Sequence, residues 1–328
     1  MDGETSHAAD AGDPRPRVVA TIGVFDGLHR GHAALIEGVC RHAAAAAAAP
    51  AVVTFDPPPQ VVLVPRDDPF QITPWEVKRR LLLEAGIEHI VLIRFTPDVA
   101  AVTPVDFIER TLLAALSPVG FVIGYDFRFG ARAAGNAALL RQLGGRHGFF
   151  VEEVEAVREA GAVISSSRVR ETLMRGAVER ARDLLGRPFA FQATVVRGKG
   201  VGRRVLVPTA NLVPDPDQLL PAAGVYAVDV FVEGHRHRAV AMVGASPTLP
   251  GTGEPAGGGE RLVEAHLLDF SEDLVGQRLE IAFLERIREG RRFAGVEQLR
   301  LAIEEDIRLA RRRLAEEGRN RLVSRAGE

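Results

Sequence analysis

Two histidines stand three residues apart in a glycine-containing segment near the start of the chain. An apolar run over residues 18–22 precedes this segment and a helical pattern follows it, so His29 and His32 are expected at a helix start, on one helix face. The N–H groups and positive dipole of a helix start favour phosphate. Two imidazoles there could donate hydrogen bonds to a triphosphate and to the charge that builds up during transfer. The alternatives are a surface pair or a metal site, although a metal would need a third ligand and no nearby Cys or HExxH motif supplies one.

A second group with phosphate-binding chemistry lies in a serine- and arginine-rich turn. Its hydroxyls and guanidinium groups could clamp the β- and γ-phosphates of a leaving pyrophosphate. These groups belong to Ser165, Ser166, Ser167, Arg168 and Arg170. Ser167 is also a good N-cap for the helix that follows. Both interpretations can hold together, because a capped helix start is itself an anion site.

A carboxylate among aromatic residues follows a later apolar run. Asp126 comes shortly after the buried-strand pattern of residues 119–123 and stands between Tyr125 and Phe127. It could orient a nucleotide or a metal ion. It could equally bond to the local backbone, with Phe127 and Phe129 as ordinary core residues. The residue types alone leave both possibilities open.

Residues suited to magnesium and phosphate recur in the second half of the chain. Glycines there would let the backbone approach phosphate closely, and a Thr hydroxyl and an Asn carbonyl suit Mg²⁺, which takes few protein oxygens. The same Thr and Asn are typical of an Asx-type turn. The residues concerned are Gly198, Gly200, Gly202, Pro208, Thr209 and Asn211.

Alternation over residues 262–268 predicts a strand with Val263, Ala265 and Leu267 on one face and Glu264 and His266 on the other. A carboxylate at a barrel mouth could accept the proton of a hydroxyl nucleophile. Alternation alone favours a solvated strand face for Glu264, and His266 is interpreted as structural.

The elements that carry these groups fall into two patterns. In the first half, apolar runs alternate with helical segments, which predicts a parallel sheet with helices on both faces and ligands beyond the carboxyl ends of its strands. We expect the alanine run 43–49 to extend the first helix and Pro50 to stop it. After Gly186, short alternating runs predict a small antiparallel barrel or sandwich, and a final helix is expected over residues 296–314.

Composition excludes several classes of protein. The 328 residues carry 41 basic and 43 acidic side chains, a net charge of −2, which gives no electrostatic footprint for nucleic acid. Cys40 is the single cysteine, so a disulfide framework is excluded and the reducing cytoplasm is indicated. No apolar stretch is long enough to span a membrane. Neither of the two lysines, Lys78 and Lys199, stands in a GxxxxGK[ST] motif, so a P-loop is absent.

The HxGH pattern after a first strand resembles the nucleotidyltransferase superfamily. Further segments, in order from about residue 17 to about residue 314, resemble the bacterial bifunctional riboflavin kinase/FAD synthetase family. They are Gly124–Gly130, Ile164–Arg170, Leu185–Phe189, Pro208–Leu212, Gly224–Ala227 and Glu264–Phe270. Each motif alone has moderate specificity, but their shared order and spacing are highly specific.

This resemblance implies a Rossmann-like FMN adenylyltransferase domain over residues 17–186 and a flavokinase β-barrel domain with a C-terminal helix over 187–316. A flexible tail (1–16) and a C-terminal tail (317–328) flank them. ATP and Mg²⁺ would serve both reactions, with riboflavin, FMN and FAD as substrates and products. The enzyme would be a cytoplasmic monomer or weak homo-oligomer, with no nucleic acid or membrane partner.

The resemblance also implies roles for individual residues. Catalysis would fall to His29 and His32 in the first domain and to Glu264 in the second, and the metal would be bound by Thr209 and Asn211. The implied nucleotide-binding residues are Gly23, Phe25, Asp26, Gly31, Asp126, Ser165, Ser166, Ser167, Arg168, Arg170, Gly198, Gly200, Gly202 and Pro208.

Four positions depart from the family pattern. Pro58 replaces a histidine between two prolines, and Leu206 replaces a glycine, while Ser246 and Gly290 are milder changes. These departures motivate an alternative, a degenerate paralogue that binds flavin or ATP without turnover or retains one activity. A third possibility is a related HxGH enzyme with another phosphorylated substrate, such as phosphopantetheine, against which the barrel motifs argue.

Overall fold

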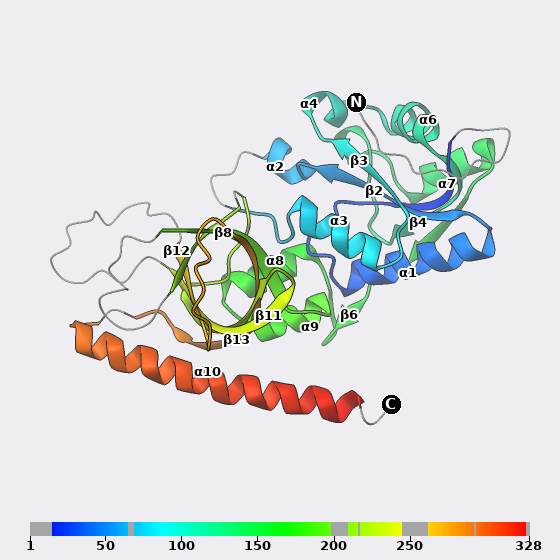
Figure 1. Cartoon of the computed structure of the whole chain (residues 1–328). Coiled ribbons are helices and arrows are strands. Elements are labelled where there is room, and N and C mark those ends of the chain that lie inside the picture. The colour runs from blue at the N-terminus through cyan, green and yellow to red at the C-terminus, as the bar shows by residue number, and fades with distance from the viewer. Residues whose placement is uncertain are drawn as a thin grey trace. The chain divides into compact units, whose positions relative to one another are not determined.

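Two compact units make up the part of the chain that the computed structural model describes (Figure 1). That part is residues 15–64, 69–197, 209–215, 217–244, 262–291 and 293–325, with only the backbone at 262 and 315–325. The first unit contains Met1–Asp67 and Trp75–Ser165, and the second contains Asp68–Pro74 and Ser166–Glu328. The division between the two compact units thus falls between Ser165 and Ser166. We had expected the domain boundary at residue 186. Most of the predicted N-terminal tail lies outside the described residues.

A five-stranded parallel sheet of order β3-β2-β1-β4-β5 forms the centre of the first unit, as the alternating pattern predicted. Its strands are β1 (Arg17–Ile22), β2 (Ala49–Asp56), β3 (His89–Arg94), β4 (Ser117–Gly124) and β5 (Phe150–Val154). The strand order reverses between β1 and β4. Ligands of open parallel sheets bind at such a switch point, beyond the carboxyl ends of the strands.

Helices cover both faces of this sheet (Figure 1). On one face, Ile36 and Val39 of α1 (Arg30–Ala45) and Leu82 of α3 (Trp75–Glu84) pack against Val19 and Val52. The other face is covered by a cluster that includes residues of η1 and α7. The remaining elements are α2 (Pro59–Leu63), α4 (Pro97–Ala100), α5 (Pro104–Asp106), the π-helix η1 (Phe107–Leu112), α6 (Leu113–Ala115), the 3₁₀-helix η2 (Ala131–Ala133), α7 (Ala137–His147), β6 (Arg158–Glu159) and β7 (Ala162–Val163).

The first helix ends earlier than its alanine run predicted. α1 stops at Ala45, and Ala47 takes a left-handed φ of 47°. The Ala48 amide donates to the Ala43 carbonyl at 3.0 Å, which closes the turn. Pro50, the expected helix stop, lies inside β2 opposite Val19. Pairing with β1 therefore overrides the helix propensity of alanine.

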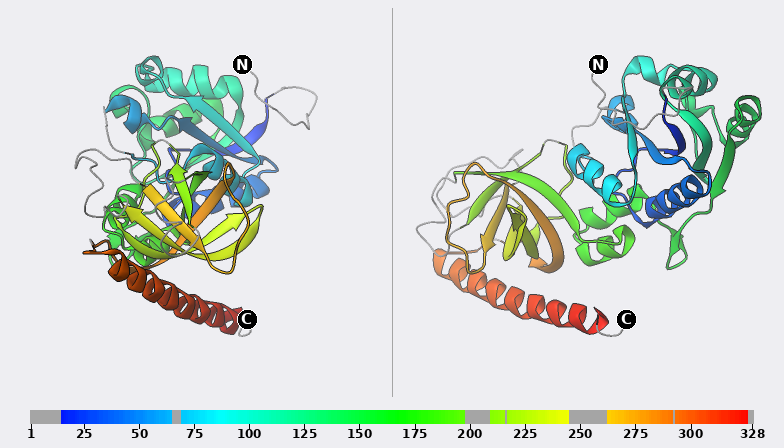
Figure 2. Two further views of the ribbon diagram at one scale, coloured as in Figure 1. Left: turned by 60° about the vertical axis from the view of Figure 1, so that its left-hand side comes forward. Right: turned by 45° about the vertical axis from the view of Figure 1, so that its right-hand side comes forward.

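In the second unit, two helices lead into a closed antiparallel barrel, and a third helix follows it (Figure 2). α8 (Ser166–Met174) and α9 (Val178–Leu185) join it through hydrogen bonds from the Ala222 amide to the Leu173 carbonyl and from the Arg286 amide to Glu179. The barrel order is β10-β11-β12-β9-β8-β13, so the barrel alternative of the sequence prediction is confirmed. Its strands are β8 (Phe189–Val196), β9 (Ala210–Pro214), β10 (Gly224–Val232), β11 (His235–Gly244), β12 (Leu262–Leu267) and β13 (Arg278–Glu289).

Aromatic side chains fill part of the barrel core. The Phe283 ring lies 5.1 Å from the Tyr226 ring and 5.8 Å from the Phe191 ring, between centroids, and all three are buried. The Tyr226 hydroxyl donates to the Ala222 carbonyl at 2.5 Å, and burial raises the pKa of Tyr226 to about 12. Along β8, buried and half-buried residues alternate, because successive side chains of a strand point to opposite faces.

The C-terminal helix α10 (Val296–Arg325) lies along the outside of the barrel (Figure 2). Ala310 and Leu314 pack against Ala227 and Leu284 on the barrel wall. The helix continues to Arg325, so its predicted end at residue 314 is wrong, and residues 317–325 of the expected tail are helical.

Candidate functional site

The turn between β1 and α1 lies at the switch point of the sheet and has a strained backbone. The Gly23 amide donates to the Val53 carbonyl at 3.0 Å. Phe25 and Leu28, which are not glycines, have left-handed φ values of 51° and 43°, and Gly27 has 88°. Asp26 in the same turn is 2% exposed. Non-glycine residues persist in this region only when their surroundings over-determine them, and they cluster at functional sites.

His29 is the N-cap of α1, as the sequence predicted for a helix start. Its Nδ1 accepts a hydrogen bond from the His32 amide at 3.3 Å. In a neutral imidazole this assignment puts the proton on Nε2, which is then the donor nitrogen. The His29 and His32 rings stack with centroids 3.7 Å apart, and the Phe25 ring lies 5.0 Å from the His32 ring. The first turn of α1 carries no acidic residue, so this helix start suits an anion.

Gly31 brings the histidine segment close to the serine turn. A Cβ at Gly31 would stand 3.1 Å from the His29 ring and 3.6 Å from the Ile164 carbonyl oxygen. Ile164 directly precedes Ser165, so the start of the predicted serine clamp lies beside the HxGH helix within the first unit. The next helix begins at Ser166. Ser167 therefore lies inside that helix, and its interpretation as an N-cap is wrong.

Arg170 has a structural partner within the second unit. Its Nε donates to the Phe70 carbonyl at 3.0 Å, and its guanidinium lies 3.6 Å from the centroid of the Phe70 ring. The Phe70 and Gln71 amides both donate to the Asp217 carbonyl. Sequence reasoning missed this segment, because residues 69–72 show no periodic pattern. The predicted phosphate-binding roles of Arg168 and Arg170 stay predictions.

Asp126 follows β4, which is the neighbour of β1 in the sheet. Its side chain is exposed, while Phe129 is buried and Phe127 packs against the same core cluster. The two phenylalanines are therefore core residues, which was one of the two interpretations open from the sequence. Asp126 shares the carboxyl edge of the sheet with the β1–α1 turn, and its nucleotide-binding role stays a prediction.

The barrel places two predicted residues opposite each other. Glu264 of β12 pairs in register with Asn211 of β9. Side chains directly opposite in an antiparallel pair have Cβ atoms roughly 5 Å apart on one face. Val263 and Ala265 are buried, whereas Glu264 and His266 are half-buried, so the predicted alternation is confirmed. Glu264 and Asn211 thus share the outer side of the barrel wall, and Thr209 directly precedes β9.

Electrostatics suits Glu264 to accept a proton. Burial raises the pKa of Glu264, since a carboxylate loses hydration there. A raised pKa makes a carboxylate a stronger base near neutral pH. The predicted phosphate loop and two of the departures lie outside the described residues: Gly198, Gly200, Gly202, Leu206, Pro208 and Ser246.

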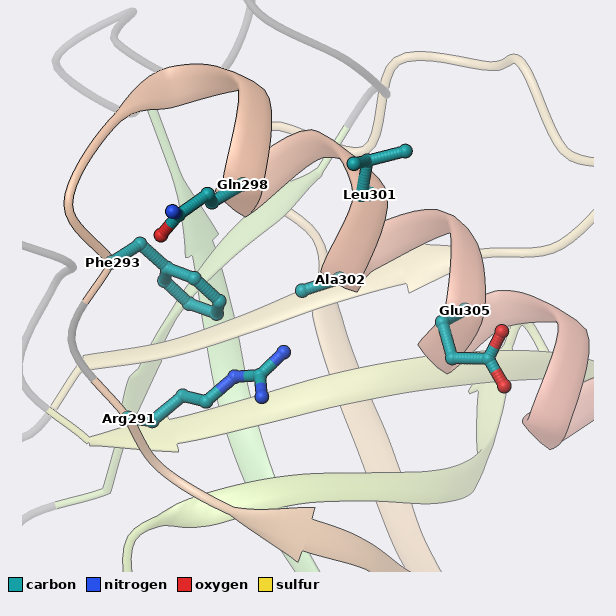
Figure 3. Close-up of a pocket in the computed structure, with 6 residues that line it drawn as sticks. All are labelled: Arg291, Phe293, Gln298, Leu301, Ala302 and Glu305. Carbon is teal, nitrogen blue, oxygen red and sulfur yellow. The ribbon is translucent and has the colours of Figure 1, made fainter.

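A cavity of about 400 Å³ lies between α10 and the segment before it (Figure 3). Sequence reasoning missed it. Its wall combines the apolar side chains of Phe293, Leu301 and Ala302 with three polar ones. The guanidinium of Arg291, one of the polar three, lies 5.0 Å from the centroid of the Phe293 ring. The other polar residues are Gln298 and Glu305.

Two departures from the family pattern can be placed. Pro58 is the buried N-cap residue of α2, with a φ of −57°. Gly290 has open surroundings: a Cβ there would have its nearest neighbour, the Gly224 amide nitrogen, at 3.9 Å. Gly290 therefore leaves room for a side chain.

Comparisons with known proteins match both units. The family model of FAD synthetase matches residues 13–168, and that of riboflavin kinase matches residues 185–314. A protein of Escherichia coli strain K12 named "Bifunctional riboflavin kinase/FMN adenylyltransferase" is 36% identical over 91% of this chain and 93% of its own length. One of the same name from Pseudomonas fluorescens is 34% identical over 89% of this chain and 92% of its own.

A solved structure shares the fold of both units. It is titled as a macrolide-efflux protein from Streptococcus pneumoniae, with 30% identity and a TM-score of 0.77 over 92% of this chain and 95% of its own. Within the described residues of this chain, none of the helices has the length and apolarity to cross a bilayer.

Proposed function

The chain belongs to the bifunctional riboflavin kinase/FMN adenylyltransferase family, and we propose that it carries out both reactions of that name. The barrel unit would transfer the γ-phosphate of ATP to riboflavin, giving FMN and ADP. The first unit would transfer AMP from ATP to FMN, giving FAD and pyrophosphate. One observation carries this proposal: each family match contains a matching candidate site. The FAD synthetase match contains the HxGH segment at a helix start, and the riboflavin kinase match contains Glu264 opposite Asn211 on the barrel.

In adenylyl transfer, a phosphate oxygen of FMN would attack the α-phosphorus of ATP while the bond to the β-phosphate breaks. Negative charge then grows on the α-phosphoryl oxygens and on the leaving pyrophosphate. The helix start at His29 supplies N–H groups, and the two stacked imidazoles supply further donors. A side chain at position 31 would meet the His29 ring. Because Gly31 has none, the phosphates can approach the helix start closely.

Several further residues of the chain would contribute to nucleotide binding in adenylyl transfer. We assign Ser165, Ser166, Ser167, Arg168 and Arg170 to the phosphates that leave. Asp126 is assigned to the nucleotide because it stands at the carboxyl edge of β4, beside β1. Gly23, Phe25 and Asp26 form the turn against which the nucleotide would lie.

In the kinase reaction, the 5′-hydroxyl of the ribityl chain would attack the γ-phosphorus of ATP, and the bond to ADP breaks. Glu264 would accept the hydroxyl proton and, in a loose transition state, mainly orient the nucleophile. Its half-buried position on β12 and its raised pKa support this role.

Both reactions would use Mg²⁺, which neutralises phosphate charge when bound. In the barrel, the Thr209 hydroxyl and the Asn211 amide oxygen would hold it, and both are hard oxygen donors of the kind that Mg²⁺ prefers. Asn211 lies opposite Glu264, so the metal and the base would share one face of β9 and β12. Among the described residues, no group of three or more His, Cys, Asp or Glu side chains is placed to hold a metal.

The cavity beside α10 would hold the flavin ring during phosphorylation. An isoalloxazine ring is flat, largely apolar and edged by polar atoms. Phe293, Leu301 and Ala302 offer apolar contacts, and Arg291 and Gln298 offer donors (Figure 3). Ligand pockets typically combine an apolar lining with a few placed polar groups in this way.

The remaining expectations concern the setting of the enzyme. The net charge of −2 and the single cysteine support a cytoplasmic enzyme that acts on small molecules rather than on nucleic acid or membranes. We also infer a monomer or weak homo-oligomer.

Flavin chromatography tests the proposal directly. The chain is incubated with ATP and Mg²⁺, with riboflavin in one tube and FMN in a second. FMN and FAD from the first tube would support both activities and show that the departures at Pro58 and Leu206 are tolerated. FAD from the second tube alone would locate a defect in the barrel, with Leu206→Gly the first change to try. FMN that accumulates without FAD would point to the first unit and to Pro58.

A further inference from the structure

A buried lysine on α3 has no part in the reactions proposed above. Lys78 is 2% exposed, and it is one of two lysines in a chain that otherwise uses arginine. Lysine is almost never fully buried unless it is paired, because its ammonium group loses hydration. Its place in the fold must therefore be explained by what the ammonium group contacts.

The ammonium group contacts the turn that leads to His29. Lys78 Nζ donates a hydrogen bond to the Val24 carbonyl at 2.9 Å. The buried Thr54 hydroxyl, near the carboxyl end of β2, donates to the same carbonyl at 3.2 Å. Two side chains from different elements thus fix one backbone carbonyl of the β1–α1 turn.

Charge adds to this anchor. The carboxylates of Asp26 and Asp56 favour the protonated ammonium, although burial still lowers the pKa of Lys78 overall. Asp26 belongs to the turn and is itself buried, while Asp56 ends β2. The turn is therefore tied to α3 by a hydrogen bond and by opposite charges.

The turn needs such an anchor, because its backbone is strained on both sides of Asp26. Phe25 and Leu28 both take left-handed φ values without being glycine. Residues in that region relax to ordinary conformations unless neighbouring contacts hold them. Relaxation at Leu28 would move His29, whose position sets the start of α1 and the stacking with His32.

We propose that Lys78, together with Thr54, is a positioning residue for nucleotidyl transfer: the two side chains anchor the Val24 carbonyl and so hold the turn that places His29 and His32. This inference rests on the proposed FMN adenylyltransferase activity of the first unit. Lys78 acts through the turn rather than on the nucleotide. A displacement of about 1 Å at a reacting centre can cost on the order of 100-fold in rate.

The test compares Lys78→Met with the wild-type chain. Methionine keeps most of the length of the side chain and removes the charge and the donor. We expect kcat for FAD formation from FMN and ATP to fall on the order of 100-fold, with much smaller changes in KM. FMN formation from riboflavin, measured on the same sample, should be unchanged, and Lys78→Arg should restore part of the lost kcat. Arg79→Met is the matched control, because it removes an exposed charge one residue further along α3.

A double-mutant cycle sharpens the test. Thr54→Val removes the second donor to the Val24 carbonyl and should also lower kcat for FAD formation, by less than Lys78→Met does. Both changes act on one carbonyl, so their combination should cost less than the product of the separate effects. If Lys78 and Thr54 had a purely structural role, the two substitutions would lower the free energy of unfolding independently and would leave kcat for FAD formation unchanged.

Three results would overturn the proposal. The first is a folded Lys78→Met variant with wild-type kcat for FAD formation. If Lys78→Met prevents folding of the first unit, Thr54→Val decides instead, and a wild-type kcat in that variant is the second. The third is a wild-type chain that makes FMN but no FAD, which would remove the proposed function of the first unit before any variant is compared.

Discussion

The two candidate sites are built in opposite ways. In the first unit, the two histidines assigned to catalysis come from one short segment, residues 23–32, where a strained turn and a helix start fix them. In the barrel, Asn211 and Glu264 come from strands far apart in sequence and meet only through the register of β9 and β12. The first site therefore depends on local backbone geometry, and the second depends on correct barrel closure.

The two sites also differ in the chemistry that their surroundings favour. The first presents donors at a helix start, with a buried lysine beneath the turn. The second presents a half-buried carboxylate whose pKa is raised by burial. The helix start at His29 therefore stabilises negative charge on phosphate, whereas the surroundings of Glu264 make its carboxylate more basic. Changes at one site should thus leave the other reaction intact.

The largest effect is expected from His29→Ala. The variant loses the N-cap of α1 and one of the two imidazoles, so FAD formation from FMN should fall by on the order of 1,000-fold. FMN formation should stay near the wild-type rate. Separate rate assays for the two steps check this, with His147→Ala, an exposed histidine on α7, as the control. Equal loss of both activities would contradict the conclusion that the two reactions use separate sites.

Glu264→Gln should have the reverse effect. It removes the proposed base and keeps the shape of the side chain, so FMN formation should fall roughly 100-fold or more while FAD formation from added FMN continues. Glu280→Gln, a half-buried glutamate on strand β13 of the same barrel, is the matched control. Retained kinase activity in Glu264→Gln would show that the carboxylate is not the base.

The pH dependence of the kinase step should follow the environment of Glu264. A base must be deprotonated, and burial raises the pKa of Glu264, so the rate should fall on acidification at a pH above the ordinary range of glutamate. Since a raised pKa means that the folded state disfavours the carboxylate, Glu264→Gln should also slightly increase the free energy of unfolding at neutral pH. Rate profiles and urea unfolding measure these effects. An acid limb at the ordinary glutamate pKa would contradict the role of burial.

The attachment of α10 should affect stability more than chemistry. Asp306, 4% exposed, accepts hydrogen bonds from Arg288 Nε and Nη2, both at 2.8 Å. Asp306→Asn leaves the guanidinium without its counter-charge and should cost about 3 kcal/mol of unfolding free energy. Urea unfolding measures this, with Glu304→Gln on an exposed turn of the same helix as control. A shift no larger than that of the control would mean that this ion pair does not hold α10.

The smallest effect is expected at Gly290. A Cβ there meets no atom closer than 3.9 Å, and the position does not require a left-handed φ. Gly290→Glu, which restores the common family residue, should leave both activities and the unfolding midpoint unchanged. A clear gain in FMN formation would instead reveal that this departure weakens the barrel site.

Sequence alone predicted what depends on nearby residues. The sheet, the helix start at His29 and the alternation around Glu264 all follow from short-range patterns, and the structure confirms them. The partner strand of Glu264 did not follow, because alternation gives the face of a strand but not its neighbour. The early end of α1 was missed for a similar reason, since pairing of β2 with β1 outweighs the preference of alanine for helix.

Two contacts were beyond any sequence pattern. Lys78 stands in an ordinary helical stretch, and only the fold brings its ammonium group to the Val24 carbonyl. The segment at Phe70 has no periodicity, yet Arg170 stacks on its ring. Both contacts join residues that are distant in sequence, so they become visible only in three dimensions.

The most direct test of two separable sites mixes two defective variants. His29→Ala and Glu264→Gln are incubated with riboflavin, ATP and Mg²⁺, separately and together, and the flavins are separated by chromatography. The account predicts FMN alone from His29→Ala, unchanged riboflavin from Glu264→Gln, and FAD from the mixture. A mixture that accumulates FMN without FAD, or FAD from either variant alone, would contradict it.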